Sequence, residues 1–424
     1  MSGKGITYWS YHYKPSSFAY KAQMQRIADF NKDHPETPAT VTNTAYSNDD
    51  LATVVAAGTP PNVAVIDRYT VAGSAARGLM QDVASLAARA AVSGNDQQPW
   101  AWQEVSFKGK LYGLPEGTDS RALYVNVGHL KQAGLPSTPP ATLEEFADIG
   151  QKLTVKQGDG FKQIGFIPWR DCWGMFGWGW LFGGDFYDPN SNRSTLEDPK
   201  VVAALDWIGT QTKQLGYAAG QAFLTAHQST NTNPFMQQVV STYFGASNFT
   251  PVLTLEGIVP AEPGLDWTVW APPPPQGASH TSSWSGGFCN VMPSGAKDPD
   301  DSFALMRYVT DQTFQRIQMQ ASLELPTFKA LAQDPFWKTV DSRYNQFLNI
   351  LPYSHSRPPI PQINILNKAL NDARDAVVMG KQTASEALKQ QNQIVNSAIQ
   401  DNRVALAGWE DDDVVMSFDD AWAF

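Results

Sequence analysis

Short apolar runs alternate with segments of helical periodicity over residues 6–120, and this alternation constrains the fold more than any other feature of the chain. Residues 6–9 and 62–67 have the composition of strands, and 18–31 repeats apolar residues at the spacing of a helix with one buried face. Strands that alternate with helices build a mostly parallel sheet covered by helices. The pattern therefore predicts an α/β fold, with the polar residues that follow 62–67 at the edge of the sheet where such folds bind ligands.

The second part of the chain has longer helical segments. Thr142, with Glu145 three residues later, predicts a helix N-terminus of the capping-box type. The other elements expected here are helices over 198–216, 300–321 and 360–403, the last broken at Gly380, and a strand over 266–271. A chain of 424 residues is two to three times the usual domain size, which favours two domains.

Composition excludes several classes of partner. Charged residues make up 17% of the chain, and hydrophobic residues 42%, which is typical of a folded globular protein. The net charge of −10 repels phosphate backbones and anionic lipids, so we expect no nucleic-acid partner and no membrane surface. No run of 18 apolar residues occurs, so no transmembrane helix is predicted.

The first residues and the cysteines leave the cellular compartment open. Residues 1–5 lead directly into the strand-like 6–9, without the charged start and apolar segment of an export signal. Two interpretations stay open: an intracellular protein, or an exported protein whose signal has been removed. Cys172 and Cys289 form no CxxC pair, and we expect buried thiols rather than a disulfide.

Signatures of catalysis and of cofactor binding are missing. The chain has no phosphate-binding GxxxxGK[ST] motif, no GxSxG motif and no HExxH motif, and the glycine–tryptophan run at 177–183 does not fit GxGxxG. Residues 188–192 copy the start of a calcium loop, but Arg193 and Pro199 stand where that loop needs glycine and glutamate. The sequence therefore predicts a protein without catalytic residues, metal or cofactor, which is not an enzyme.

Aromatic residues are the most informative part of the composition. The chain has 14 Trp, 14 Tyr and 21 Phe, and the Trp and Tyr residues cluster at a few places. Large amphipathic rings in excess of what a core needs indicate a surface that binds a flat ligand with polar edges.

Several short blocks, taken in order, resemble the extracellular solute-binding proteins that feed ABC importers, in particular the maltose-binding-protein-like, carbohydrate-binding branch. The blocks are 61–67 with 78–82, then 110–115 with 123–126, 133–135 and 140–146, then 182–185 with 198–199, and finally 284–287 with 300–311 and 325–326. The chain departs from the family pattern at two places. Residues 239–245 replace the usual Gly-Lys-Ala-Ala-Met before the central ligand loop, and the secretion leader is missing.

The resemblance implies a two-lobed periplasmic-binding-protein fold with a ligand cleft between the lobes and several hinge crossovers. Lobe one is expected over 1–116 and 265–313, and lobe two over 117–264 and 314–424. It also implies closure by hinge motion and delivery of the ligand to the permease subunits of an ABC importer. The protein is then expected to be a monomer in the periplasm or outside the cell, and a lipid anchor stays open.

A sugar ring has an apolar face and a rim of hydroxyls, so its site needs aromatic rings together with polar side chains. The chain offers both at loop positions, several of which correspond to contact segments that the resemblance implies. The residues expected to contact the ligand are Trp9, Tyr11, His12, Asp67, Arg68, Tyr69, Glu116, Asp119, Arg121, Trp169, Trp173, Trp178, Asn248, Trp284, Gly286, Gly287, Tyr353 and Arg357.

The functional hypothesis is a non-catalytic receptor for a mono- or oligosaccharide. Two alternatives stay open. The same fold could bind an amino acid, a polyamine or a phosphorylated polyol. Alternatively, the chain could be a secreted carbohydrate-active enzyme that uses two acids near Glu116, Asp119 and Asp185.

Overall fold

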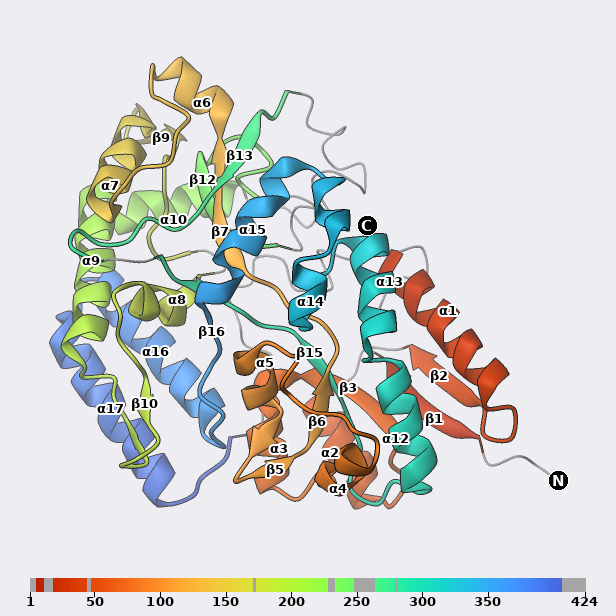
Figure 1. Cartoon of the computed structure of the whole chain (residues 1–424). Helices are drawn as coiled ribbons and strands as arrows, with labels where there is room; N and C mark the ends of the chain where they lie inside the picture. Colours follow the sequence, from red (N-terminus) through yellow and green to blue (C-terminus); the bar gives the residue numbers. More distant parts are fainter. Residues whose placement is uncertain are drawn as a thin grey trace.

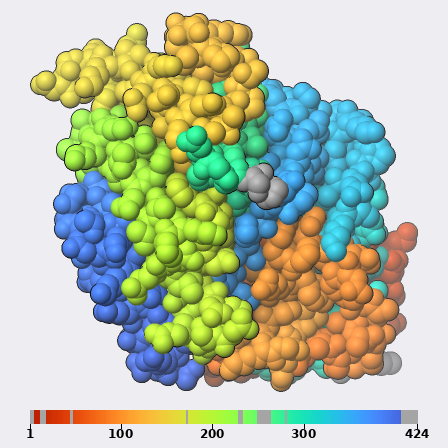
Figure 2. Space-filling view, turned by 60° about the vertical axis from the view of Figure 1, so that its left-hand side comes forward, coloured from red at the N-terminus to blue at the C-terminus, as the bar shows by residue number. Residues whose placement is uncertain are grey.

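The computed structural model describes residues 5–10, 18–43, 47–170, 173–227, 233–247, 264–278 and 281–405. Two main sheets, each with its own set of helices, organise this part of the chain (Figure 1). In the space-filling view of Figure 2, yellow-green segments of the middle of the chain lie beside orange segments of its first third.

The first sheet has five strands in the order β2-β1-β3-β15-β6. Strands β1, β2 and β3 are parallel, as the alternating pattern predicted, whereas β15 is antiparallel to both of its neighbours. The strands are β1 (Ile6–Ser10), β2 (Ala39–Asn43), β3 (Val63–Asp67), β6 (Gly113–Pro115) and β15 (Phe288–Val291). The first four residues of β3, 63–66, are all buried, so both faces of this sheet are covered.

Helices from two distant parts of the chain cover the first sheet. In Figure 1, α1, α12 and α13 lie together on one side of it, and α1 packs on α13. The helices of this half are α1 (Phe18–Asp33), α2 (Asn48–Ala56), α3 (Val71–Ala76), α4 (Ala84–Arg89), α5 (Pro99–Glu104), α12 (Pro299–Tyr308) and α13 (Gln312–Ser322).

The single helix expected over 300–321 is wrong, because the chain forms α12 and α13 there. Asp311 separates them: its carboxylate accepts a hydrogen bond from the backbone N–H of Phe314 at 2.7 Å and so caps the start of α13. The same carboxylate pairs with Arg26 of α1 at 2.5 Å. The ion pair with Arg26 therefore supports a new helix start at Asp311, although the helical spacing of apolar residues continues through 300–321.

The second sheet has three strands in the order β12-β7-β13, with both outer strands antiparallel to β7. These strands are β7 (Arg121–Asn126), β12 (Thr242–Ala246) and β13 (Trp267–Trp270). The helices of this half are α6 (Val127–Gln132), α7 (Leu143–Lys152), α8 (Gly174–Leu181), α9 (Pro199–Leu215), α10 (Tyr217–Ala226), α15 (Asn345–Ile350), α16 (Ile363–Val378) and α17 (Ala384–Gln400). Helix α14 (Lys329–Ala332) is bonded to the first half, where the backbone N–H of Lys329 donates to the carbonyl of Asp96 at 2.9 Å.

Four helix boundaries in this half follow the sequence signals. Thr142 caps α7 by accepting a hydrogen bond from the backbone N–H of Glu145 at 3.2 Å, whereas Glu145 Oε2 accepts from the backbone N–H of Ala141 at 2.8 Å, so the start is predicted correctly but the reciprocal bond of a capping box is replaced. Asp198 caps α9, and Gly216 ends it. Gly380, with a positive φ of 69°, ends the turn after α16, and α17 then packs back on α16 and α9.

Short two-stranded sheets complete the described structure. They are β4 (Ser106–Phe107) with β5 (Lys110–Leu111), β8 (Val155–Gln157) with β9 (Gly160–Gln163), β10 (Tyr187–Asp188) with β11 (Arg193–Ser194), and β14 (Ser283–Trp284) with β16 (Ser354–His355). Over the described ranges, no helix combines the length and the apolar character that crossing a membrane requires.

The chain passes between the two sheets at three places. The first crossing joins β6 to β7, and the second joins β14 to β15. The third follows α13, where the backbone N–H of Thr118 in the first crossing donates to the carbonyl of Leu325 at 2.8 Å. Strand β13 pairs with β7, so the chain rejoins the first sheet only at β15. The expected lobe boundary at 313/314 falls inside α13, which packs against α1.

Candidate functional site

Three of the expected site residues lie at the end of β3. The Asp67 carboxylate accepts a hydrogen bond from the backbone N–H of Tyr69 at 3.3 Å, which begins a single 3-10 turn over Arg68–Thr70. This turn buries the Arg68 side chain completely and leaves Tyr69 half-buried. The carboxyl end of β3 therefore presents an acid and an aromatic ring at the edge of the first sheet.

A second group comes from strand pairing between distant segments. Strand β14 runs parallel to β16, with Trp284 opposite His355, and the backbone N–H of Ser285 donates to the His355 carbonyl at 2.8 Å. This pairing brings Arg357, which follows β16, to Trp284. The guanidinium carbon of Arg357 lies 5.1 Å from the Trp284 ring centroid.

Aromatic rings and guanidinium groups alternate in the order Tyr69, Arg357, Trp284 and Arg121. The guanidinium carbon of Arg357 is also 3.5 Å from the ring centroid of Tyr69, and that of Arg121 is 3.6 Å from the ring centroid of Trp284. A cation over an aromatic face is attracted by the ring quadrupole, so these contacts hold the four side chains in order. We call Asp67, Tyr69, Asp119, Arg121, Trp284 and Arg357 the Trp284 cluster.

The two acids of the Trp284 cluster each accompany one arginine. Asp67 Oδ1 lies 3.7 Å from Arg357 Nη2, and Asp119 Oδ2 lies 3.7 Å from Arg121 Nε. Each ion pair places a hydrogen-bond acceptor next to a donor. A hydroxyl group is both donor and acceptor and can bridge such a pair.

Trp284 is the most enclosed ring of the cluster. It is 6% exposed, and its indole Nε1 is buried without a hydrogen-bond acceptor in the described part of the chain. Phe176 and Trp180 of α8 pack on it, with ring centroids 5.7 and 6.2 Å away. The indole is thus held by packing while its donor stays unused, and a buried unused donor costs stability unless a partner arrives.

The two glycines that follow Trp284 shape the backbone of the second crossing. The N–H of Gly286 donates to Asp119 Oδ1 and so positions one acid of the cluster. Gly287 has φ 136°, and a Cβ there would lie 2.6 Å from the carbonyl oxygen of Gly117. Only glycine allows this close approach of two crossings.

Arg68 and Glu116 lie behind the cluster, in the interior. Arg68 donates to the carbonyls of Gly117 and Gly286 and pairs with Glu104 at 3.0 Å. Glu116 is 2% exposed and accepts hydrogen bonds from Asn290 Nδ2 at 2.8 Å and Gln318 Nε2 at 3.2 Å. Burial raises the pKa of Glu116 to about 7.

Four expected tryptophans lie apart from the cluster. Trp173 and Trp178 are 0% and 1% exposed and pack on Phe244 with ring centroids 4.9 and 5.2 Å away, so they form part of the core of the second sheet. Trp169 packs on Tyr217, 5.1 Å between ring centroids. Trp9 lies on β1, half-buried against the core of the first sheet.

The remaining expected residues divide into two kinds. Tyr353 is 46% exposed and lies in the turn before β16. Tyr11, His12 and Asn248 lie outside the described residues.

His355 and Trp180 were not among the expected contacts. The His355 ring stacks on Trp180, with ring centroids 5.2 Å apart and planes at 12°. His355 is exposed, and β16 holds it directly beside Trp284. The pairing of β14 with β16 joins two-residue strands about seventy positions apart, and no local pattern in the sequence signals it.

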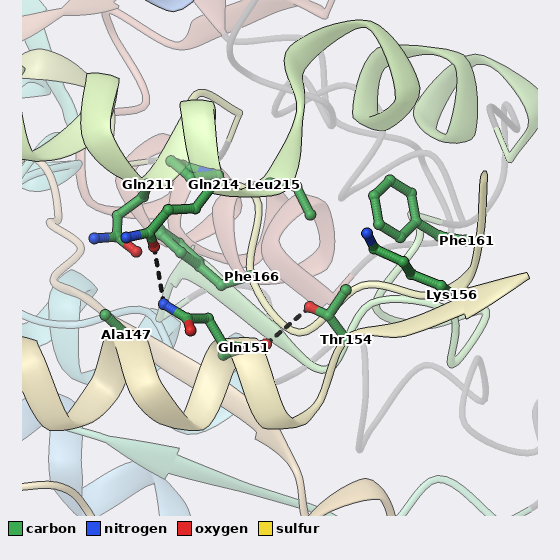
Figure 3. A pocket seen from close by; sticks show the side chains of 11 residues that line it. Ala147, Gln151, Thr154, Lys156, Phe161, Phe166, Gln211, Gln214 and Leu215 are labelled. Carbon is green, nitrogen blue, oxygen red and sulfur yellow. Dashed lines mark hydrogen bonds between the residues drawn. The ribbon is translucent and has the colours of Figure 1, made fainter. Parts of the chain in front are cut away.

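A separate groove of about 210 Å³ lies between α7, the β8–β9 hairpin and α9 (Figure 3). Three glutamines, one lysine and two phenylalanines give it a mixed surface, and Gln151 Nε2 donates to Gln214 Oε1 at 2.8 Å across it. Its lining residues are Ala147, Gly150, Gln151, Thr154, Lys156, Phe161, Phe166, Pro168, Gln211, Gln214 and Leu215. None of them belongs to the Trp284 cluster.

The calcium-like start at 188–192 forms a turn. The Asp188 carboxylate accepts hydrogen bonds from the backbone N–H of Asn190 at 2.9 Å and from the hydroxyl of Ser191 at 2.6 Å, inside the β10–β11 hairpin. Within the described ranges, no three histidine, cysteine or acidic side chains lie close enough to hold a metal ion. Cys289 is a buried free thiol, and Cys172 is outside those ranges.

The comparison with known families decides which kind of protein this is. The model of the bacterial extracellular solute-binding proteins matches residues 25–341, about three quarters of the chain. The chain belongs to this family. The expected family of extracellular solute-binding proteins is therefore confirmed.

Individual relatives agree with the family. A galactooligosaccharide-binding protein of Bacillus subtilis is 23% identical and aligns over 86% of this chain and 83% of its own. A probable ABC transporter-binding protein of Deinococcus radiodurans is 26% identical over 66% of this chain and 67% of its own. The solved structure of CpMnBP1 with mannotriose bound has a TM-score of 0.78 at 22% identity, over 92% of this chain and 99% of that one. This solute-binding protein therefore has the predicted periplasmic-binding-protein fold.

Proposed function

We propose that this solute-binding protein is a non-catalytic receptor that binds an oligosaccharide at the Trp284 cluster and delivers it to the permease subunits of an ABC importer. The observation that carries the proposal is the alternation of Tyr69, Arg357, Trp284 and Arg121 across segments of both halves of the molecule. Two similar proteins, a galactooligosaccharide-binding protein and CpMnBP1 with mannotriose bound, support the same ligand class.

The chemistry of the cluster suits a polyhydroxylated ring. Tyr69 and Trp284 supply aromatic surface for the C–H face of a sugar. The pairs Asp67–Arg357 and Asp119–Arg121 supply acceptors and donors for its hydroxyls, and the Trp284 indole N–H is a further donor. Because each arginine is matched by an acid, the cluster favours a neutral ligand over a phosphorylated one or a polyamine.

The binding free energy from such contacts is sufficient for micromolar affinity. Hydrogen bonds to charged groups contribute about 1.5–3 kcal/mol each, and stacked rings about 0.5–1.5. Three or four such hydrogen bonds and two ring contacts, less the cost of ordering, reach the roughly −8 kcal/mol of micromolar binding. No covalent step is needed.

The proposal includes a lobe division based on sheet membership. The first lobe contains 1–116 with β15, α12, α13 and α14, and the second contains β7 to β13 with α15 to α17. Asp67 and Tyr69 come from the first lobe, whereas Arg357 comes from the second, so the cluster is complete only when the two lobes meet. The protein would act as a monomer outside the cytoplasmic membrane.

Isothermal titration with mono- and oligosaccharides, amino acids and polyamines tests this function. We expect binding of at least one oligosaccharide at micromolar affinity. Tyr69→Ala should weaken it about tenfold, the value of one ring contact. Gln214→Ala, in the separate groove, is the matched control and should bind normally. Binding of an amino acid or polyamine alone, or of no compound in the panel, would overturn the proposal.

A further inference from the structure

We propose that Arg68 is a positioning residue that fastens the first and second chain crossings together and so sets the resting angle between the lobes, instead of contacting the ligand. The inference rests on the proposed function, because it concerns the closing of the same site. Arg68 was expected at the ligand from its place after β3, and its complete burial motivates a different role.

The contacts of Arg68 join three parts of the chain. Its side chain starts from the end of β3, and its Nη1 and Nη2 donate to the carbonyls of Gly117 in the first crossing and Gly286 in the second, the latter at 2.5 Å. Its backbone N–H donates to the carbonyl of Gly287 at 3.0 Å. One residue directly after β3 is thus bonded to both crossings at the point where they leave the first sheet.

The crossings are also bonded to each other at this point. The Thr118 hydroxyl lies 2.6 Å from the Ser285 hydroxyl and donates to the Gly286 carbonyl at 2.9 Å. The backbone N–H of Thr118 reaches the third crossing at the Leu325 carbonyl, 2.8 Å away. A change in the guanidinium position therefore acts on all three connections between the lobes.

The charge and the planar shape of the guanidinium group make arginine the residue that fits position 68. Glu104 of α5 pairs with Arg68 Nε at 3.0 Å, and Trp100 of the same helix lies 5.7 Å from the guanidinium carbon. Glu104 is 1% exposed, so the pair is shielded from water. The planar guanidinium donates in three directions at once, whereas a lysine ammonium on its flexible stem cannot hold all three acceptors in this geometry.

The geometry also separates this role from ligand contact. Arg68 is 0% exposed, and its donors point at backbone carbonyls. Its neighbours Asp67 and Tyr69 belong to the Trp284 cluster, and Gly286 positions Asp119. Arg68 therefore acts on the site through the backbone on both sides of it.

Single-molecule energy transfer between dyes on the two lobes tests the proposal without any ligand. Dyes at Arg77→Cys and Lys389→Cys, in a Cys172→Ser background, report the interlobe distance; both positions are exposed. We expect one narrow distance population in the parent protein and a clearly broader one in Arg68→Lys. If the population competent to close falls about tenfold, apparent sugar affinity falls about tenfold as well.

Three further variants make every outcome decisive. Arg89→Lys, which changes an exposed ion pair, should leave the distances unchanged, and Tyr69→Ala should weaken sugar binding without broadening them. Arg68→Met combined with Glu104→Met removes both buried charges and should also broaden the distribution. Unchanged distances in the Arg68 variants, or failure of both to fold, would overturn the proposal. Absence of sugar binding by the parent protein would overturn the proposed function alone.

Discussion

At the scale of single residues, the candidate site depends on how aromatic and charged side chains share one small volume. Trp284 is held by Phe176 and Trp180 and contacts Arg121, and its buried indole N–H has no acceptor in the described structure. The sequence nominates Trp284 as one of several aromatic residues expected to contact the ligand. It could not separate Trp284 from Trp173 and Trp178, because whether a ring fills a core or faces a ligand depends on tertiary packing.

Trp284→Phe should weaken saccharide binding about tenfold while the fold is retained, because it removes the indole donor and part of the stacking surface. Isothermal titration measures the affinity. Trp337→Phe is the matched control, since Trp337 is equally buried but donates to the carbonyl of Leu331 in another cluster, and its affinity should not change. Equal losses in both variants would assign the effect to general destabilisation.

Glu116 should make stability depend on pH. Burial raises its pKa from 4.5 to about 7, so between these values the folded protein holds a proton that the unfolded chain has released. The free energy of unfolding should therefore fall as pH rises from about 4.5 to about 7, by about 1.4 kcal/mol for each unit of pKa shift. Glu116→Gln removes this contribution.

Urea denaturation at a series of pH values from 4.5 to 8 measures the slope. Glu116→Gln should show a flatter dependence than the parent protein. Glu36→Gln, at an exposed position, should have the same pH dependence of the free energy of unfolding as the parent protein. An unchanged slope in Glu116→Gln would contradict the role assigned to burial.

At the scale of elements, capping signals predicted helix boundaries well where the cap is local. Thr142, Asp198 and Gly380 mark boundaries through their own side chain or backbone conformation. The break between α12 and α13 was missed because Asp311 is stabilised by Arg26, nearly three hundred residues away. The sequence predicted a strand at β13. It did not predict that this strand pairs with β7 in the second sheet, because pairing between distant segments leaves no local pattern.

Asp311→Ala should lower the free energy of unfolding by about 1–2 kcal/mol, because it removes the cap of α13. Loss of the pair with Arg26, which is itself nearly buried, adds to this effect. Urea denaturation gives the value. Asp300→Ala, which removes an exposed ion pair with Arg89, should cost less than about 1 kcal/mol. Similar costs in the two variants would show that the cap contributes little.

At the scale of the whole molecule, two sheets joined by three crossings place segments from the first, second, third and last quarters of the chain at one site. Asp67, Asp119, Trp284 and Arg357 are far apart in sequence, so the sequence could nominate them only singly. The family resemblance implies that they contact one ligand, and the fold brings them together. The pairing of β14 with β16 and the burial of Arg68 could be learned only from the structure.

A ligand that contacts both lobes should stabilise the whole protein and make it more compact. At a saccharide concentration about 100 times Kd, the free energy of unfolding should rise by about 2.7 kcal/mol. Thermal denaturation measures the stabilisation, and small-angle X-ray scattering measures the radius of gyration, which should decrease on binding. A thermal shift without compaction would indicate binding to one lobe alone.

A crystal structure with the tightest-binding saccharide would examine the Trp284 cluster atom by atom. We expect a sugar ring against Trp284 and Tyr69, with its hydroxyls bonded to the Asp67–Arg357 and Asp119–Arg121 pairs. A saccharide seated elsewhere, for example in the groove between α7 and α9, with the Trp284 cluster unchanged and in no contact with it, would contradict the assignment.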